Sequence, residues 1–154
     1  MQASKEQIIK VPNAELLEDI SSMLQAGHSV ELSAKGQSMS PFIRNGVDRI
    51  VLEKTADLDI FDIALARIKP DFYVVHRIIR ISGSTITLMG DGNLQQTEIT
   101  SRENILGTVS FIIKPNGKRV DCHSARAKRL ASLWFRLLPI RRYILAIWFR
   151  TIGR

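Results

Sequence analysis

Six short runs of apolar and β-branched residues follow one another through the middle of the chain, and they restrict the fold more than any other feature. Turn-forming residues such as Asn45-Gly46 and Ser82-Gly83-Ser84 separate the runs. Strands at this spacing predict a mainly β domain, built as a compact antiparallel barrel or folded sheet. The runs are residues 29–34, 48–53, 60–68, 72–80, 85–89 and 105–114.

Helices are predicted on both sides of this β segment. Asn13 precedes an apolar pattern of helical period that ends at Gly27, which predicts a capped helix over residues 13–26. From Ser124 the pattern is helical again, and Pro139 interrupts it. We therefore expect a first domain of residues 1–122 with its core at 29–114, followed by a helical tail of residues 123–154.

The tail carries the net positive charge of the chain. Eight of the 22 basic residues and none of the 15 acidic residues lie beyond Cys122, so the tail is +8 and the remainder, 14 basic against 15 acidic, is −1. A basic, aromatic-rich tail indicates an anionic partner, and we predict that residues 124–154 contact an anionic membrane surface. The apolar run at 143–149 is too short to span a bilayer, which favours helices lying in the membrane plane. Packing of both helices on the first domain, or on a partner chain, is the alternative.

Two further features limit the class of protein. Cys122 is the only cysteine, which excludes an intrachain disulfide and a multi-cysteine metal site; we expect no metal and no cofactor. The sequence from Met1 is polar and lacks the apolar centre of a secretory signal. A cytoplasmic or peripheral-membrane location is therefore expected, with the side of the membrane left open.

The segment Gly36-Gln37-Ser38-Met39-Ser40-Pro41 lies between the first two predicted strands and is expected to form a loop. A serine in such a loop can present its hydroxyl outside the sheet, while nearby backbone N–H groups face the carbonyl of a substrate. Ser38 is accordingly a candidate nucleophile. An ordinary turn is the competing interpretation, because turns use the same residue types.

His76 is the best placed of the three histidines to act as a base for Ser38. Strand alternation puts it on the same face as Val74 and Ile78, in apolar surroundings that favour the neutral, proton-accepting imidazole. His28 and His123 are expected at the surface. A buried histidine bonded to a carbonyl is the structural alternative for His76.

An imidazole base needs an acceptor on its second nitrogen, and Asp91 is the candidate for that role. It lies in the turn Gly90-Asp91-Gly92-Asn93 after the next predicted strand. An ordinary turn aspartate is the alternative interpretation. Asp48 and Asp62 are reserve candidates.

The order of these segments resembles the signal-peptidase and LexA-type serine peptidase superfamily over about residues 30–109. The matching pieces are Gly36-Gln37-Ser38-Met39-Ser40-Pro41, Asn45-Gly46-Val47-Asp48-Arg49-Ile50-Val51-Leu52, Asp62-Ile63-Ala64-Leu65, Val75-His76-Arg77-Ile78, Gly90-Asp91-Gly92-Asn93 and Leu106-Gly107-Thr108-Val109. Each piece is loose by itself, whereas five or six in order are specific.

The resemblance implies roles for individual residues. The serine before methionine is the nucleophile, Ser38, and His76 takes the base position as in the endoplasmic-reticulum and archaeal types, where bacterial types have lysine. Asp91 is implied as the orienting acid. The nucleophile loop, with Gly36, Gln37, Met39 and Pro41 beside Ser38, is implied to bind the oxyanion and the substrate. The resemblance thus predicts a serine endopeptidase that cleaves a leader or signal-like segment of a peptide or preprotein, bound as an added strand.

Three departures from the family pattern affect this expectation. Gly36 stands where signal peptidases usually have a serine that helps to bind the oxyanion, so backbone N–H groups, including that of Ser38, would carry that role. The usual Gly-Asp pair is Phe61-Asp62, and the second motif is stretched to Gly46-Val47-Asp48. The basic tail replaces the membrane span of typical signal peptidases.

Other functions remain as alternatives. A catalytically silent peptide-binding or regulatory module could have the same fold. A LexA-like regulator is disfavoured because only one predicted helix precedes the β segment, leaving no room for a helix-turn-helix; we expect no nucleic-acid partner. A lysine base, Lys54 or Lys69, is a further variant of the peptidase hypothesis.

Overall fold

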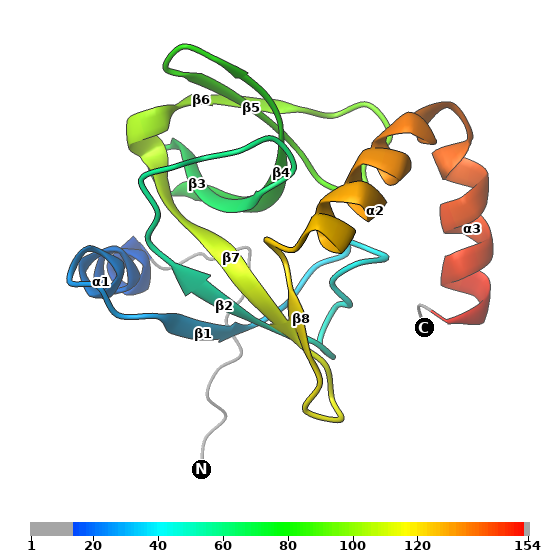
Figure 1. Ribbon diagram of the computed structural model, residues 1–154, viewed down its shortest axis with the longest axis horizontal. Helices are drawn as coiled ribbons and strands as arrows, with labels where there is room; N and C mark the ends of the chain where they lie inside the picture. Colours follow the sequence, from blue (N-terminus) through cyan, green and yellow to red (C-terminus); the bar gives the residue numbers. More distant parts are fainter. Residues whose placement is uncertain (1–13, 153–154) are drawn as a thin grey trace.

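One antiparallel sheet forms the centre of the protein, as shown by a computed structural model that describes residues 14–152 (Figure 1). Its strand order is β1-β2-β7-β3-β4-β5-β6, with β8 paired to β7 beside this path, and the sheet is not closed. The mainly β prediction is confirmed, as an open sheet and not as a closed barrel. The strands are β1 (Val30–Ser33), β2 (Arg49–Glu53), β3 (Ile63–Lys69), β4 (Phe72–Ser82), β5 (Thr85–Met89), β6 (Glu98–Ser101), β7 (Ile105–Ile113) and β8 (Arg119–Asp121).

All six predicted strands are present, and two short ones were missed. β6 has four residues and β8 has three, and such lengths carry little periodic signal. β6 pairs with β5, with Leu88 opposite Glu98. This pairing determines where Glu98 lies in the site described below.

β4 pairs with different strands along its length, and its register with β5 shifts between Ile78 and Arg80. Its first half pairs with β3 on one side, with Ala64 opposite His76, whereas its pairing with β5 on the other side begins only at Arg77. Bulges of this kind bend a strand and sharpen its twist. Residues 72–76 of β4 therefore have no strand paired to their second edge within the described part of the chain.

The helix α1 (Ala14–Gln25) forms where the apolar period predicted it. Leu17, Ile20 and Leu24 are buried in the larger of two hydrophobic clusters, together with side chains of β1, β2 and β7. Gly27 ends the helix with φ 89°, and its N–H donates to the carbonyl of Leu24. The smaller cluster lies among β3, β4 and β5.

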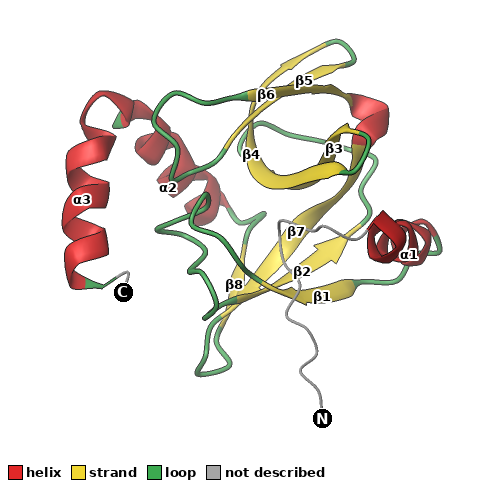
Figure 2. Ribbon diagram, turned by 180° about the vertical axis from the view of Figure 1, so that it is seen from behind, coloured by secondary structure: helices red, strands yellow, loops and turns green. Residues whose placement is uncertain are grey.

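The tail folds as two helices, α2 (Ala125–Arg136) and α3 (Arg141–Thr151), joined by a short 3₁₀ turn (Leu138–Ile140) that contains Pro139. The predicted interruption at Pro139 is confirmed. α2 lies between the sheet and α3 in both ribbon views (Figures 1 and 2). Among residues 14–152, no helix has the length and apolar character needed to cross a membrane.

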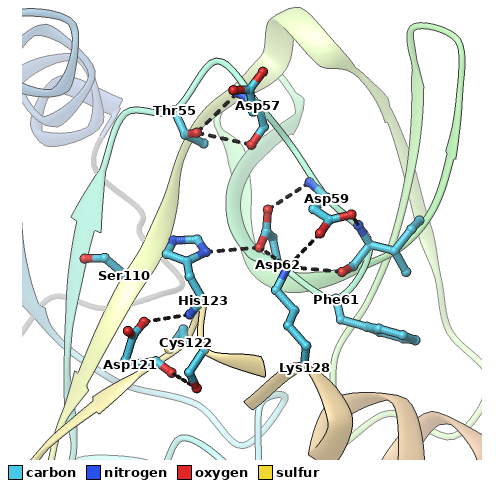
Figure 3. Close-up of polar contacts among 12 residues, drawn as sticks. Thr55, Asp57, Asp59, Phe61, Asp62, Ser110, Asp121, Cys122, His123 and Lys128 are labelled. Atoms are coloured by element: carbon cyan, nitrogen blue, oxygen red, sulfur yellow. Dashed lines mark hydrogen bonds and ion pairs between the residues drawn. The ribbon is translucent and has the colours of Figure 1, made fainter. Parts of the chain in front are cut away.

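Asp62 joins α2 to the sheet. Its carboxylate accepts a hydrogen bond from Lys128 of α2 at 2.6 Å, and His123 Nδ1 lies 3.2 Å away (Figure 3). The acid is buried, whereas His123 is exposed, as predicted. At least α2 therefore packs on the sheet, in keeping with the alternative to the membrane prediction.

Candidate active site

The loop that carries Ser38 is held by its neighbours on both sides. Met39 is buried in the main hydrophobic cluster, and the N–H of Ile43 donates to its carbonyl at 2.9 Å. On the other side, the N–H of Gly36 donates to Asn45 Oδ1 at 2.8 Å. Ser38 lies between these two anchors, is partly exposed and faces a pocket. The loop prediction is thus confirmed.

A second loop, residues 90–93, packs directly on the Ser38 loop. The N–H of Gly92 donates to the carbonyl of Ser38 at 2.8 Å. A Cβ atom added at Gly90 would lie 2.4 Å from that same carbonyl oxygen and 3.0 Å from His76 Nε2. Glycine at position 90 therefore allows the Ser38 backbone and the His76 ring to come together at this point.

His76 is held by an acid that the sequence interpretation missed. Its side chain lies on β4, is 6% exposed, and Nδ1 forms a short hydrogen bond with Oε1 of Glu98 on β6. Glu98 is itself only 7% exposed. Where Nδ1 donates to the carboxylate, the other ring nitrogen, Nε2, which lies beside Gly90, is the one that can accept a proton.

The predicted role of Asp91 beside His76 is wrong. The Asp91 carboxylate accepts two hydrogen bonds from Arg77, at 2.8 Å from Nε and 2.7 Å from the terminal nitrogen, and both side chains are buried. Burial opposes the charge of Arg77, but the attraction and hydrogen bonds of Asp91 outweigh it and raise the pKa of the guanidinium. Neighbouring residues of a strand point to opposite faces, so the acid that meets Arg77 cannot also meet His76.

The reserve acids are also engaged elsewhere. Asp48 is buried and accepts hydrogen bonds from Arg44 and from Lys114, the latter at 2.9 Å. Burial alone would raise the pKa of Asp48, but these hydrogen bonds outweigh burial and lower it. Asp62 binds Lys128, as described above.

The pocket in front of Ser38 has a volume of about 390 Å³ and contains the three candidate groups Ser38, His76 and Glu98 in its wall. Gly36 and Gln37 also line it. Met39 is buried beneath the loop, and Pro41 lies outside the lining. The remaining lining residues are Lys35, Phe72, Tyr73, Val74, Val75, Asn93 and Gln96.

Ser38 and His76 thus share one pocket, but within residues 14–152 the Ser38 hydroxyl forms no hydrogen bond with the imidazole. Bonds between nucleophile and base are often long without substrate. Of the alternative bases, Lys54 lines a different pocket, and Lys69 lies with Nζ 5.6 Å from the centre of the Phe72 ring. Neither lysine lines the Ser38 pocket.

The described residues contain no group of three or more His, Cys, Asp or Glu side chains that could hold a metal ion. Cys122 is buried at the end of β8, where burial raises the pKa of its thiol to about 12. A thiol that stays protonated at neutral pH is a poor nucleophile.

Two comparisons with known proteins bear on the family. No model of a known protein family matches the sequence. No curated protein matches it significantly either.

Proposed function

We propose that this protein is a serine endopeptidase of the signal-peptidase and LexA type, with Ser38 as nucleophile, His76 as general base and Glu98 as the acid that orients His76. One observation carries the proposal. Ser38 and the buried His76–Glu98 pair line a single pocket, and they come from three separate segments of the chain. A carboxylate on Nδ1 fixes the orientation of the imidazole and would stabilise the imidazolium formed during attack, as a general base requires.

The proposed reaction begins with attack of Ser38 Oγ on the carbonyl carbon of the scissile bond. His76 Nε2 takes the hydroxyl proton, and Glu98 stabilises the imidazolium that forms. The proton then passes to the leaving amine as the C–N bond breaks, which leaves an acyl-enzyme. A water activated by His76 hydrolyses the ester and restores Ser38. Because Gly36 offers no hydroxyl, the oxyanion would be bound by backbone N–H groups, including that of Ser38.

The free edge of β4 supports a peptide as substrate. Within the described part of the chain, residues 72–76 pair only with β3, and each of these residues contributes to the wall of the pocket that contains Ser38. An extended peptide can bind to such an edge through backbone hydrogen bonds, with alternate side chains entering the pocket. A leader or signal-like segment, which is extended and accessible, fits this mode.

The composition and exposure of the tail support a location near an anionic membrane surface. Several apolar side chains of the tail are partly exposed, exposed arginines lie among them in the sequence, and no acidic residue follows Asp121. Such a surface combines apolar contact with attraction to anionic lipid headgroups. The exposed apolar residues of the tail are Leu130, Leu133, Phe135, Ile140, Tyr143, Ile147 and Ile152.

A fluorophosphonate probe and a set of leader peptides test the enzymatic proposal. The wild type should form a covalent adduct at Ser38 and cleave at least one peptide, whereas Ser38→Ala and His76→Ala should do neither. His28→Ala is the matched control, because that histidine is exposed and remote from the pocket. Peptide binding with no adduct, retained in Ser38→Ala, would instead support a catalytically silent peptide-binding module.

Liposome flotation tests the membrane proposal. The full chain should float with vesicles that contain phosphatidylserine and should remain at the bottom with vesicles of phosphatidylcholine alone. Equal behaviour with the two lipid compositions would reject the proposal.

A further inference from the structure

Two side chains of the tail reach across to the loop of residues 90–93. Trp134 of α2 donates its Nε1–H to the carbonyl of Asp91 at 2.8 Å. Arg141, the first residue of α3, donates to the carbonyl of Asn93 at 2.9 Å and to that of Trp134 at 3.1 Å. The tail is therefore hydrogen-bonded to the loop that packs on the nucleophile.

This contact continues to Ser38 through one further hydrogen bond. The N–H of Gly92 donates to the Ser38 carbonyl at 2.8 Å, and Gly92 lies between the two residues that the tail holds. Phe42, just beyond the Ser38 loop, meets the Trp134 ring edge to face with the centroids 6.1 Å apart. The tail thus contacts both the loop of residues 90–93, which packs on Ser38, and Phe42, which follows the Ser38 loop in the sequence.

Arg141 is an unusual residue for a simple packing contact. Its side chain is only 2% exposed, it stacks 5.0 Å from the Trp134 ring centroid, and its Nε atom is buried without a partner among the described residues. Desolvation, with repulsion from Arg77, lowers the pKa of Arg141 despite the attraction of Asp91. An apolar side chain would fill the same space at lower cost, but it could not join two backbone carbonyls from different segments.

We propose that Trp134 and Arg141 are positioning residues that hold Ser38 in its reactive geometry through the loop of residues 90–93, so that the tail is a working part of the peptidase site. The inference rests on the proposed function for its kinetic consequence. Displacement of a nucleophile by about 1 Å can cost roughly a hundredfold in rate. Among the described residues, no hydrogen bond joins His76 or Glu98 directly to the tail, so we expect the midpoint of the pH profile of kcat/KM to stay close to that of wild type in the same variants.

Two conservative pairs of variants test the inference in the full-length chain. Trp134→Phe keeps one aromatic ring and removes the N–H together with the five-membered ring of the indole, and Trp148→Phe makes the same change in α3, where Trp148 packs against Phe149. Arg141→Ala is matched by Arg142→Ala, since Arg142 is exposed and bonds only to the Tyr143 hydroxyl. Arg141→Lys serves if Arg141→Ala does not fold, because one ammonium group cannot reproduce the fork that joins both carbonyls.

The expected result is a tenfold to hundredfold lower kcat for Trp134→Phe and for the Arg141 variants, with KM within twofold of wild type and an unchanged midpoint in the pH profile of kcat/KM. Both controls should keep wild-type kcat. Wild-type kcat in the Trp134 and Arg141 variants, or an equal loss in the controls, would overturn the inference.

Amide hydrogen exchange supplies a readout that needs no substrate. The Gly92 amide should exchange about tenfold faster in the Trp134 and Arg141 variants than in wild type or the controls, because its bond to Ser38 opens more often. Unchanged Gly92 exchange would overturn the inference. If wild type formed no adduct and cleaved no peptide, the proposed function would fail, while the exchange measurement would still decide whether the tail positions the Ser38 loop.

Discussion

Replacing Glu98 by glutamine should lower kcat strongly while changing the stability of the protein little. The substitution keeps the size of the side chain and removes the negative charge beside His76 Nδ1. At an effective dielectric constant of about 20, unit charges roughly 4 Å apart attract by about 4 kcal/mol, and the imidazolium formed during attack would lose most of this stabilisation. Since about 1.4 kcal/mol corresponds to a tenfold change in rate, kcat should fall by about 10² to 10³.

A second effect of Glu98→Gln acts in the same direction. The amide can turn its NH₂ group toward Nδ1, which would place the imidazole proton on Nε2 and remove the base. The assay is kcat for cleavage of a leader peptide, combined with thermal unfolding. We expect a large loss of kcat with little change in Tm.

Asp91→Asn is the comparison variant, because Asp91 is the residue that the sequence predicts as the acid orienting His76. It leaves the buried Arg77 guanidinium without a counter-charge, which should cost about 3–5 kcal/mol of stability. Chemical denaturation measures this loss. Near wild-type kcat in Glu98→Gln, together with a large loss in an Asp91→Asn protein that remains fully folded, would refute our assignment of the acids.

Three further predictions concern other parts of the structure. Burial raises the pKa of the Cys122 thiol from its ordinary value of 9.0 to about 12, so its contribution to stability is complete below about pH 9 and is lost toward pH 12. Wild type should lose about 1 kcal/mol more than Cys122→Ala between pH 7 and pH 10 in urea unfolding. The pKa of Asp48 is lowered in the fold, so its contribution to stability is present above about pH 4 and is lost at lower pH. Asp48→Asn should cost about 1–3 kcal/mol of stability at pH 7 and make stability depend less on pH in acid, as followed by circular dichroism. Gly90→Ala places a Cβ 2.4 Å from the Ser38 carbonyl oxygen and should lower kcat about a hundredfold, whereas wild-type kcat would show that the two loops are not held together as described.

Most of the secondary structure could be predicted because its signals are local. The helix at Ala14–Gln25 has an apolar stripe and a terminating glycine, and the six predicted strands lie in apolar or β-branched runs between turns. The strands β6 and β8 are three or four residues long and form only because β5 and β7 supply their hydrogen-bond partners. No pattern within so short a segment reveals such pairing.

The site could be predicted where the evidence was local, and not where it depended on the sheet. The residue types around Ser38 predict a loop and the strand alternation around His76 predicts a buried ring, and the structure shows that both residues line one pocket. Glu98 could not be identified from the sequence, because it is far from His76 along the chain and lies on β6, a strand that the apolar pattern did not predict. The contacts of Trp134 and Arg141 also depend on tertiary packing, since the tail sequence shows an amphipathic helix but not the loop that it covers.

The two buried acids next to β4 bond to different side chains of that strand, and the alternation of strand side chains explains this. His76 and Arg77 are adjacent, so they face opposite sides of the sheet, and each needs its own carboxylate. Glu98 supplies one from β6, and Asp91 supplies the other from the loop that packs on Ser38. Arg77 thereby fixes the Asp91 loop from the sheet side while Trp134 fixes it from the tail side. If Ser38 is the nucleophile, as we propose, a loop held from both sides would position it, because among the described residues its hydroxyl has no hydrogen bond to His76.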